Sequence, residues 1–279
     1  MITIILQGGL GNQLFQIFTV ISYAIQNNID FYFFQIKNKN VKRPFYWDNF
    51  LINLKPYIKT EPTINKQAKI LKEKHFGFNL KMIDRIQNNL KIFQNICLDG
   101  YFQTPLYFNS YKREICNIIG MDNIISNLNI PYYKNKTSIH FRLGDYKHLQ
   151  GCHPILPIKY YIDSINHLIK HYNNNVLDIV YFFEHDDITI INENISILKK
   201  EFKNINFLPC DNSLSDWEQL LCMSLCENNI IANSTFSWWS AYLNKNKDKL
   251  IIYPSIWFGP LINNNTKDLF DDSWVKINI

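Results

Sequence analysis

Thr137-Ser-Ile-His140-Phe-Arg142-Leu-Gly-Asp145-Tyr146 is the stretch of this chain that predicts its fold. Its apolar first half has the character of a short buried strand, and His140, Arg142 and Asp145 would lie at the carboxyl end of that strand or in the turn after it. Ligands of α/β proteins bind at this edge of the sheet. A guanidinium there suits an anion, because its planar fork matches pairs of phosphate or carboxylate oxygens. A surface ion pair between Arg142 and Asp145 is the alternative, and the stretch alone favours neither.

Strand-like and helix-like segments alternate on both sides of this stretch. Strands are predicted at 2–6, 31–34, 138–141, 177–183, 206–208, 230–232 and 250–253, with a further strand or loop at 98–102. Helices are predicted at 12–26, 67–71, 80–90, 109–119, 159–172, 188–202 and 217–226, and another would begin near Phe236. Such alternation indicates parallel sheets that are covered by helices on both faces.

The Asn-rich segment 127–136, which contains Pro131, is the best candidate for a linker. The β/α pattern restarts after it. We therefore predict an α/β protein of two Rossmann-like domains, at 1–130 and 137–279, with a cleft between them.

Composition and charge narrow the class of protein. The chain has 279 residues, of which 47% are hydrophobic and 15% aromatic, so it is expected to be globular. A net charge of +5 at pH 7 favours a phosphorylated or nucleotide-bearing ligand. The basic residues are scattered and form no run, which argues against nucleic acid as the main partner.

The cysteines and the hydropathy of the sequence indicate the cellular compartment of the protein. The six cysteines form no C-x-x-C pair, and Cys222 and Cys226 would share one face of a helix as core thiols. Reduced thiols fit a reducing compartment. A strand that begins at Ile2 leaves no room for a signal peptide, and no apolar run is long enough to span a bilayer. We therefore expect a cytoplasmic protein.

The glycine turn Gly8-Gly9-Leu-Gly11 resembles a dinucleotide-binding loop only in part. Leu14 stands where the third glycine of that loop would be, and this speaks against NAD. Asp30 lies near the place of a ribose-binding acid, but no G-K-[ST] follows, which excludes a P-loop. What remains is a turn that presents N–H groups to an anion or a sugar hydroxyl, or a tight turn with no ligand.

A second polar stretch, Asn233-Ser-Thr-Phe-Ser237-Trp-Trp239, follows a predicted strand and precedes a predicted helix. Its hydroxyl groups would therefore lie at a helix N-terminus. There they can cap the helix or bind an oxygen anion, and capping is the commoner role.

Four stretches together resemble the α-1,2-fucosyltransferases of glycosyltransferase family 11. They are Gly8-Gly-Leu-Gly-Asn-Gln-Leu-Phe-Gln16, Asp99-Gly-Tyr-Phe-Gln103, His140-Phe-Arg-Leu-Gly-Asp-Tyr146 and Asn229-Ile-Ile-Ala-Asn-Ser-Thr-Phe-Ser-Trp-Trp239, and Pro254-Ser-Ile-Trp-Phe258 also matches. The resemblance implies a GT-B fold, GDP-fucose as donor, no metal requirement and inversion at the anomeric carbon. One position departs from the family pattern His-x-Arg-Arg-x-Asp, because Leu143 replaces the second arginine.

The resemblance and the chemistry of the reaction assign roles to residues. Arg142 would bind the donor pyrophosphate. The donor-binding set is completed by His140, Asp216, Asn233, Ser234, Thr235, Phe236 and Ser237. Asp216 would accept hydrogen bonds from guanine, with an N-cap of the following helix as the alternative. The acceptor or a sugar hydroxyl would be bound by Gly9, Gly11, Asn12 and Gln13. The general base would be His153 or Asp145.

Three rival functions stay open. Glu184-His185-Asp186-Asp187 could hold a divalent cation in a metal-dependent GT-A transferase. Because Leu143 replaces an arginine of the family pattern, a non-catalytic sugar-binding protein is a second alternative. The glycine turn leaves an NAD-dependent oxidoreductase as the third. We predict instead an inverting transferase that moves fucose from GDP-fucose to the 2-hydroxyl of a terminal galactose or related sugar. Its partners would be a nucleotide sugar and a glycan acceptor, with no cofactor.

Overall fold

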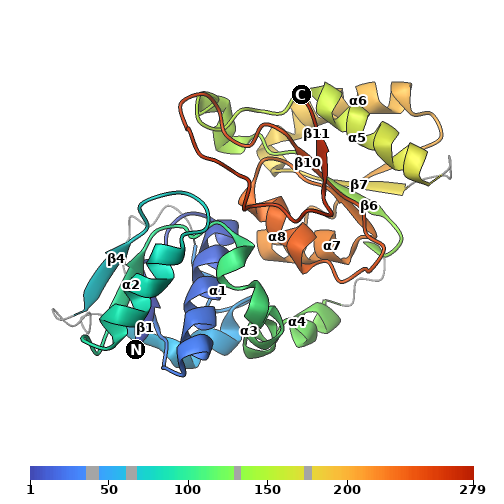
Figure 1. The fold of residues 1–279 in the computed structure, drawn as a ribbon. Helices are drawn as coiled ribbons and strands as arrows, with labels where there is room; N and C mark the ends of the chain where they lie inside the picture. Colours follow the sequence, from blue (N-terminus) through green and yellow to red (C-terminus); the bar gives the residue numbers. More distant parts are fainter. Residues whose placement is uncertain (36–43, 61–67, 129–132, 173–177) are drawn as a thin grey trace. The chain divides into compact units, whose positions relative to one another are not determined.

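The chain forms two compact units in a computed structural model that describes residues 1–35, 44–60, 68–128, 133–172 and 178–279 (Figure 1). The first unit combines 1–128 with 265–270, and the second combines 129–264 with 271–279. The sequence-based boundaries leave 265–270 in the second region, but these residues pack with the first unit. Leu269 is fully buried there, and the Thr104 hydroxyl donates a hydrogen bond of 2.6 Å to the Asp268 carbonyl.

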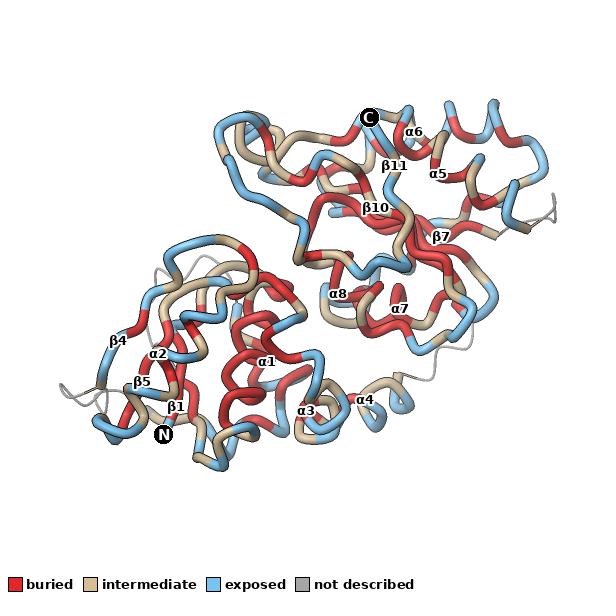
Figure 2. The backbone as a smooth tube through the Cα atoms, viewed as in Figure 1, coloured by how far each residue is buried: buried red, intermediate tan, exposed pale blue. Residues whose placement is uncertain are grey.

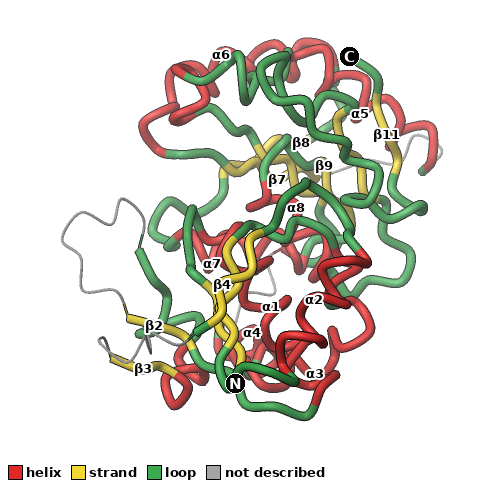
Figure 3. Tube along the Cα trace, turned by 60° about the vertical axis from the view of Figure 1, so that its left-hand side comes forward, coloured by secondary structure: helices red, strands yellow, loops and turns green. Residues whose placement is uncertain are grey.

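The first unit is built on short parallel strands (Figure 3). Its three-stranded sheet has the order β1-β5-β4, with β1 at Ile2–Ile4, β5 at Ile96–Asp99 and β4 at Lys69–Lys72. The parallel pair β2 (Phe33–Gln35) and β3 (Ile58–Thr60) lies next to β1 through a bridge between Ile2 and Phe31. Its α-helices are α1 (Leu10–Asn27), α2 (Leu80–Leu90), α3 (Lys112–Ile119) and α4 (Met121–Asn127).

Helix α1 is the core of this unit (Figure 2). Ile17, Phe18 and Ile21 are fully buried, as the helical spacing predicts. The ring of Phe108 packs edge-on against Phe18 with centroids 5.4 Å apart. The helix ends at Asn28, whose left-handed backbone (φ 49°) lets its N–H bond back to the last turn.

The second unit contains one parallel six-stranded sheet of order β11-β10-β9-β6-β7-β8. The strands are β6 (Thr137–His140), β7 (Asp178–Phe182), β8 (Asn206–Pro209), β9 (Asn228–Ile230), β10 (Ile251–Pro254) and β11 (Val275–Ile277). In chain order this is the 3-2-1-4-5-6 arrangement of a Rossmann sheet. The strand order therefore reverses between β6 and β9.

Helices cover both faces of this sheet (Figure 1). They are α5 (Ile158–His171), α6 (Ile188–Glu201), α7 (Asp216–Leu225) and α8 (Thr235–Leu243). Ile179 of β7 joins the core cluster formed with α5 and α6, whereas its neighbour Val180 joins the cluster formed with α7. Successive side chains of a strand point to opposite faces, which explains the alternation. The predicted α/β fold with parallel sheets is confirmed.

Several elements differ from the secondary-structure predictions. Within the predicted helix 67–71, the described residues enter the edge strand β4, because backbone pairing with β5 outweighs local preference. Strand β9 begins two residues earlier than expected, at Asn228. Polar residues are tolerated there because buried partners satisfy them; the Asn229 amide donates 2.7 Å hydrogen bonds to Ser138 Oγ and the Met223 carbonyl. Strand β11 follows the predicted last strand, and its three half-exposed or exposed residues leave little periodic signal.

All six cysteines are free, and Cys222 and Cys226 are buried core residues, as predicted. None of the helices in the described ranges is long and apolar enough to cross a membrane. Part of the predicted linker, 129–132, lies outside the described residues.

Candidate functional site

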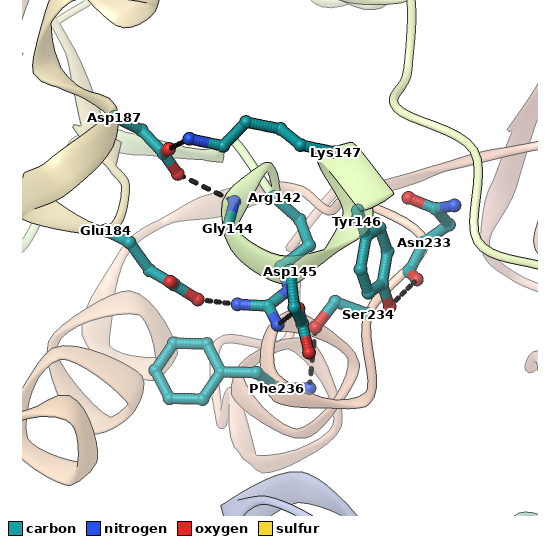
Figure 4. Close-up of polar contacts among 10 residues, drawn as sticks. All are labelled: Arg142, Gly144, Asp145, Tyr146, Lys147, Glu184, Asp187, Asn233, Ser234 and Phe236. Carbon is teal, nitrogen blue, oxygen red and sulfur yellow. Dashed lines mark hydrogen bonds and ion pairs between the residues drawn. The ribbon is translucent and has the colours of Figure 1, made fainter. Parts of the chain in front are cut away.

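Two loops meet where the strand order of the second unit reverses (Figure 4). One follows β6 and carries residues 142–146, and the other follows β9 and carries residues 233–236. We call these carboxyl ends and their loops the β6/β9 edge. Ligands of doubly wound sheets bind at such a reversal point, outside the carboxyl ends of the strands. The predicted donor residues around Arg142 and Ser234 are therefore brought together by the topology.

Arg142 is the centre of this edge. Its guanidinium forms ion pairs with the carboxylates of Asp145 and of Glu184, which follows the neighbouring strand β7. Its side chain is only 15% exposed, whereas each carboxylate side chain is 47% exposed. The Arg142–Asp145 ion pair is therefore present, at the carboxyl edge of the sheet, and anion binding by Arg142 stays a prediction. Two carboxylates balance the cation here, and an incoming anion would compete with them.

Gly144 makes the turn between these groups possible. Its φ is +39°, and a Cβ there would lie 2.5 Å from the Glu184 carboxylate. The Gly144 N–H donates a hydrogen bond of 2.8 Å to Asp187, whose other oxygen lies 2.5 Å from Lys147 Nζ. Glu184 and Asp187 thus pair with cations of the Arg142 loop. No group of three or more potential metal ligands occurs among the described residues.

Leu143 points away from this edge. It is 4% exposed and belongs to the core cluster that also contains Phe141 and Tyr161. The position therefore needs an apolar side chain in this protein. This accounts for the departure from the family pattern without removing the cation at Arg142.

His140, the last residue of β6, is buried and neutral. Burial, assisted by the positive charge of Arg142, lowers its pKa to about 3. Its Nδ1 finds no hydrogen-bond partner among the described residues, and its ring lies 5.4 Å from that of Phe236. A neutral imidazole beside an aromatic ring suits a flat, uncharged ligand group such as a nucleobase.

The β9–α8 loop is held by its own polar side chains. Ser234 caps helix α8 by accepting a hydrogen bond of 3.3 Å from Phe236 N–H, and Thr235 begins the helix half-buried. The Asn233 amide donates 2.9 Å to the Pro154 carbonyl. Ser237 is fully buried, and its hydroxyl accepts a hydrogen bond from Ala232 N–H. The prediction that the Ser237 hydroxyl contacts the donor is therefore not supported by its position; it joins strand to helix.

His153 lies beside the same cluster. Its ring stacks on Tyr146 with centroids 4.9 Å apart and an interplanar angle of 21°. Its loop is tied down, because the Cys152 carbonyl accepts a hydrogen bond of 2.8 Å from Gly259 N–H. Burial lowers the pKa of His153; nearby Asp145 opposes this shift and Arg142 adds to it. Both predicted candidates for the general base, His153 and Asp145, are therefore near Arg142.

The comparison with protein families decides the class of this protein. The model of "Glycosyl transferase family 11" matches residues 1–278. The chain belongs to glycosyltransferase family 11. The resemblance deduced from its motifs is confirmed.

Two curated relatives match almost end to end. An O-antigen biosynthesis glycosyltransferase, WbnK, of Escherichia coli is 29% identical, over 98% of this chain and 99% of the relative. An alpha-1,2-colitosyltransferase of Escherichia coli is 27% identical, over 98% of this chain and 97% of the relative.

Two solved structures are more distant. E. coli heptosyltransferase WaaC with ADP has a TM-score of 0.47 at 10% identity, covering 99% of this chain and 92% of its own. POFUT1 in complex with GDP has a TM-score of 0.47 at 12% identity, covering 90% and 97%. At this level of similarity they add nothing to the assignment.

Asp216 is an exposed residue in the first turn of α7 in this family 11 protein. It is not the N-cap that the sequence offered as its alternative role. Ser215 occupies that position and forms a capping box with Glu218, whose carboxylate accepts a 2.8 Å hydrogen bond from Ser215 N–H. Helix α7 follows β8, so Asp216 lies on the same edge of the sheet as Arg142.

The predicted acceptor residues lie at a corresponding edge of the first unit. We call it the β1/β5 edge: the carboxyl ends of β1 and β5, the turn and helix start at 8–13, and the loop 100–103. Gly9 is the N-cap of α1, Gly11 is buried in its first turn, and Asn12 Oδ1 accepts a 2.9 Å hydrogen bond from Gln103. Gln13 is 1% exposed, and its amide donates to the Gly8 and Pro44 carbonyls at 3.0 and 2.9 Å. The predicted contact between Gln13 and a sugar is therefore not supported by its position, because its amide N–H groups are bonded to backbone carbonyls.

Tyr146 and Glu184 are members of the site that the sequence analysis did not assign to the donor. Tyr146 is the last residue of the very stretch that carries Arg142, so its place in the motif was an available signal. Glu184 was predicted only as a possible metal ligand. Its pairing with Arg142 has no signal in the sequence, because it depends on β7 lying next to β6.

Proposed function

We propose that this family 11 glycosyltransferase moves fucose from GDP-fucose to the 2-hydroxyl of a terminal galactose or related sugar, with inversion and without a metal ion. The observation that supports this most is the position of Arg142 at the reversal point of a Rossmann sheet. A GT-B arrangement, with the acceptor on the first unit and the donor on the second, is part of the proposal.

Arg142 and the start of helix α8 would act on the leaving group. As the bond between the anomeric carbon and the diphosphate oxygen breaks, negative charge grows on GDP. Fixed cations and N–H dipoles that face such charge are commonly the largest catalytic contribution. The donor diphosphate would replace the Asp145 and Glu184 carboxylates on the guanidinium, while His140 and Asp216 would face the nucleoside.

His153 is the better candidate for the general base. The acceptor hydroxyl attacks the anomeric carbon on the face opposite GDP, and its proton must pass to a base within hydrogen-bond reach. The carboxylate of Asp145 is already paired with Arg142, whereas burial keeps the His153 imidazole neutral near pH 7. The imidazole can therefore take the proton.

Metal independence is proposed because the protein's own charges are matched. Lys147 and Arg142 pair with Asp187 and Glu184, the acids that a metal-dependent enzyme would use. Transfer that persists at full rate in excess EDTA is expected. Loss of activity in EDTA that Mn²⁺ restores would contradict the proposal and favour the metal-dependent alternative.

A related donor is a second candidate. One relative of this chain is an alpha-1,2-colitosyltransferase, and its 27% identity extends over nearly the whole length of both proteins. A colitosyl donor would use the same diphosphate contacts at Arg142. The free thiols suit a reducing compartment, and on that ground we place the reaction in the cytoplasm.

A screen of nucleotide sugars by thermal unfolding tests the proposal. A ligand that binds only the folded state raises the melting temperature. GDP-fucose and GDP-colitose should raise it, and UDP- or ADP-sugars should not. Transfer to galactosides is then measured with each stabilising donor. Stabilisation by UDP-sugars alone would refute the donor assignment, and tight GDP-sugar binding without turnover on any galactoside would favour a non-catalytic binding protein.

A further inference from the structure

Tyr146 contacts three groups of the proposed site at once. We infer that Tyr146 is a positioning residue that holds the diphosphate-binding Arg142 and the base His153 in one arrangement. The inference rests on the proposed function. Tyr146 itself has no assigned role in donor binding or proton transfer.

The ring of Tyr146 supports the guanidinium of Arg142 (Figure 4). The guanidinium carbon lies 4.8 Å from the ring centroid, within the range of an attractive cation–π contact. The guanidinium has five N–H donors, so this contact leaves donors available for other partners. The N–H groups that now bind Asp145 and Glu184 can therefore turn to a diphosphate while the ring contact is kept.

The hydroxyl of Tyr146 ties the two loops of the β6/β9 edge together. It donates a hydrogen bond of 3.0 Å to the carbonyl of Asn233, which lies beyond β9. Burial raises the pKa of the Tyr146 hydroxyl, although Arg142 opposes this, so the group remains a donor. The bond fixes the distance between the arginine loop and the start of helix α8, the two places where anionic oxygens would be received.

The third contact places the base. The imidazole of His153 stacks on the Tyr146 ring, and the carbonyl of the next residue, Pro154, accepts a hydrogen bond from the Asn233 side chain. Tyr146 and Asn233 thus hold the His153 loop from two sides. Movement of the Tyr146 ring would displace cation and base together.

Two substitutions separate the ring from the hydroxyl. Tyr146→Phe keeps the surface under Arg142 and His153 but releases the Asn233 carbonyl. Because donor binding depends on the ring, the dissociation constant for GDP should change less than about threefold, while kcat falls several-fold as the base loosens. Tyr146→Leu removes the ring, and GDP should bind roughly 3- to 30-fold more weakly, the range expected for loss of a cation–π contact, with a further loss in kcat.

Tyr172→Phe and Tyr172→Leu are matched controls. The Tyr172 hydroxyl also makes a 3.0 Å hydrogen bond, to Asn228 at the opposite, amino end of β9. These variants should lower the melting temperature without changing GDP affinity or kcat. Calorimetric titration with GDP, steady-state kinetics and thermal unfolding are measured on all five proteins.

The outcomes are distinct. Weaker GDP binding in Tyr146→Leu, restored in Tyr146→Phe, supports the inference. GDP affinity and kcat equal to those of the unaltered protein in Tyr146→Leu would overturn it while leaving the proposed function intact. Loss of GDP affinity in proportion to melting temperature, in the Tyr172 variants as well, would show a merely structural role. Failure of the unaltered protein to bind GDP would refute the proposed function and the inference with it.

Discussion

The β1/β5 edge and the β6/β9 edge are built on the same kind of parallel sheet but differ in how their polar side chains are used. At the β1/β5 edge the amides of Asn12, Gln13 and Gln103 bind one another or backbone carbonyls. At the β6/β9 edge Arg142 is held by two half-exposed carboxylates. The amides of the first edge are bonded within the protein, and the second edge carries a cation with exchangeable partners.

Two residues of the family motifs can have different tasks. Gln13 and Arg142 both belong to stretches that identify the family, yet Gln13 stabilises its loop and Arg142 faces the edge where ligands bind. Amide groups suit sugar hydroxyls, whereas a guanidinium suits a diphosphate. We therefore expect substitutions at the β6/β9 edge to change donor binding or transfer, and a substitution at Gln13 to change stability alone.

Arg142→Ala should have the largest effect. Transfer should fall at least about 100-fold, because the leaving diphosphate loses its fixed cation. Arg142→Lys should recover little, since an ammonium group cannot bind two oxygens in parallel. Steady-state transfer with the best donor is the measurement, and Lys159→Ala, which removes an exposed helical ion pair, is the control. Near-normal turnover of Arg142→Ala would break the comparison.

His153→Ala should reduce kcat by roughly 10²- to 10⁴-fold, the usual contribution of a general base. The same assignment predicts a pH dependence. A base must be neutral, and burial lowers the pKa of His153 below its ordinary value. In the unaltered protein the acid limb of kcat/KM should therefore be centred below pH 6.5, the ordinary pKa of histidine. An acid limb centred above pH 7 would contradict the role of His153.

Gln13→Leu should affect stability and leave donor binding alone. The Gly8 and Pro44 carbonyls would lose their donor in a buried place, which costs about 1–3 kcal/mol of unfolding free energy. Thermal unfolding should show a lower melting temperature, and calorimetry an unchanged affinity for GDP. Asn89→Ala, which removes a helix-surface amide bond, is a control. A large loss of GDP affinity would mean that the β1/β5 edge also serves the donor.

Glu184→Gln should have the smallest effect and the opposite sign. Removing one negative charge relieves competition for Arg142, so GDP should bind about 2- to 5-fold more tightly, as the modest strength of half-exposed ion pairs implies. Calorimetric titration of GDP is the measurement. Weaker binding would show instead that Glu184 orients the guanidinium for the donor.

Much of the fold could be predicted from local pattern. Helix α2 was predicted with its observed bounds, since its apolar residues follow the helical period without interruption. Strand β4 was predicted as a helix and β11 was not predicted, because both are short edge strands stabilised by pairing with a neighbour. Residues 265–270 gave no sign of packing with the first unit, since the bond from Thr104 to Asp268 joins positions far apart in the chain.

Only part of the candidate site, like only part of the fold, could be predicted from the sequence. The motifs identified His140, Arg142, Asn233 and Ser234, because residues at strand ends with these chemistries are conspicuous in sequence. The motifs could not show that the Ser237 hydroxyl and the Gln13 amide are buried and hydrogen-bonded to backbone groups. Nor could they show that Glu184 pairs with Arg142, since that contact exists only when β7 lies beside β6.

The sequence by itself determined the class of fold, the family and the cation on which the proposed function depends. These follow from periodicity and from residue types at strand ends, which are local properties. The tertiary structure was needed to show which polar side chains are bonded within the protein, that Leu143 belongs to the core, and that Tyr146 joins Arg142, His153 and Asn233. Those facts depend on the order 3-2-1-4-5-6, which brings β6 and β9 together across about 90 residues of chain.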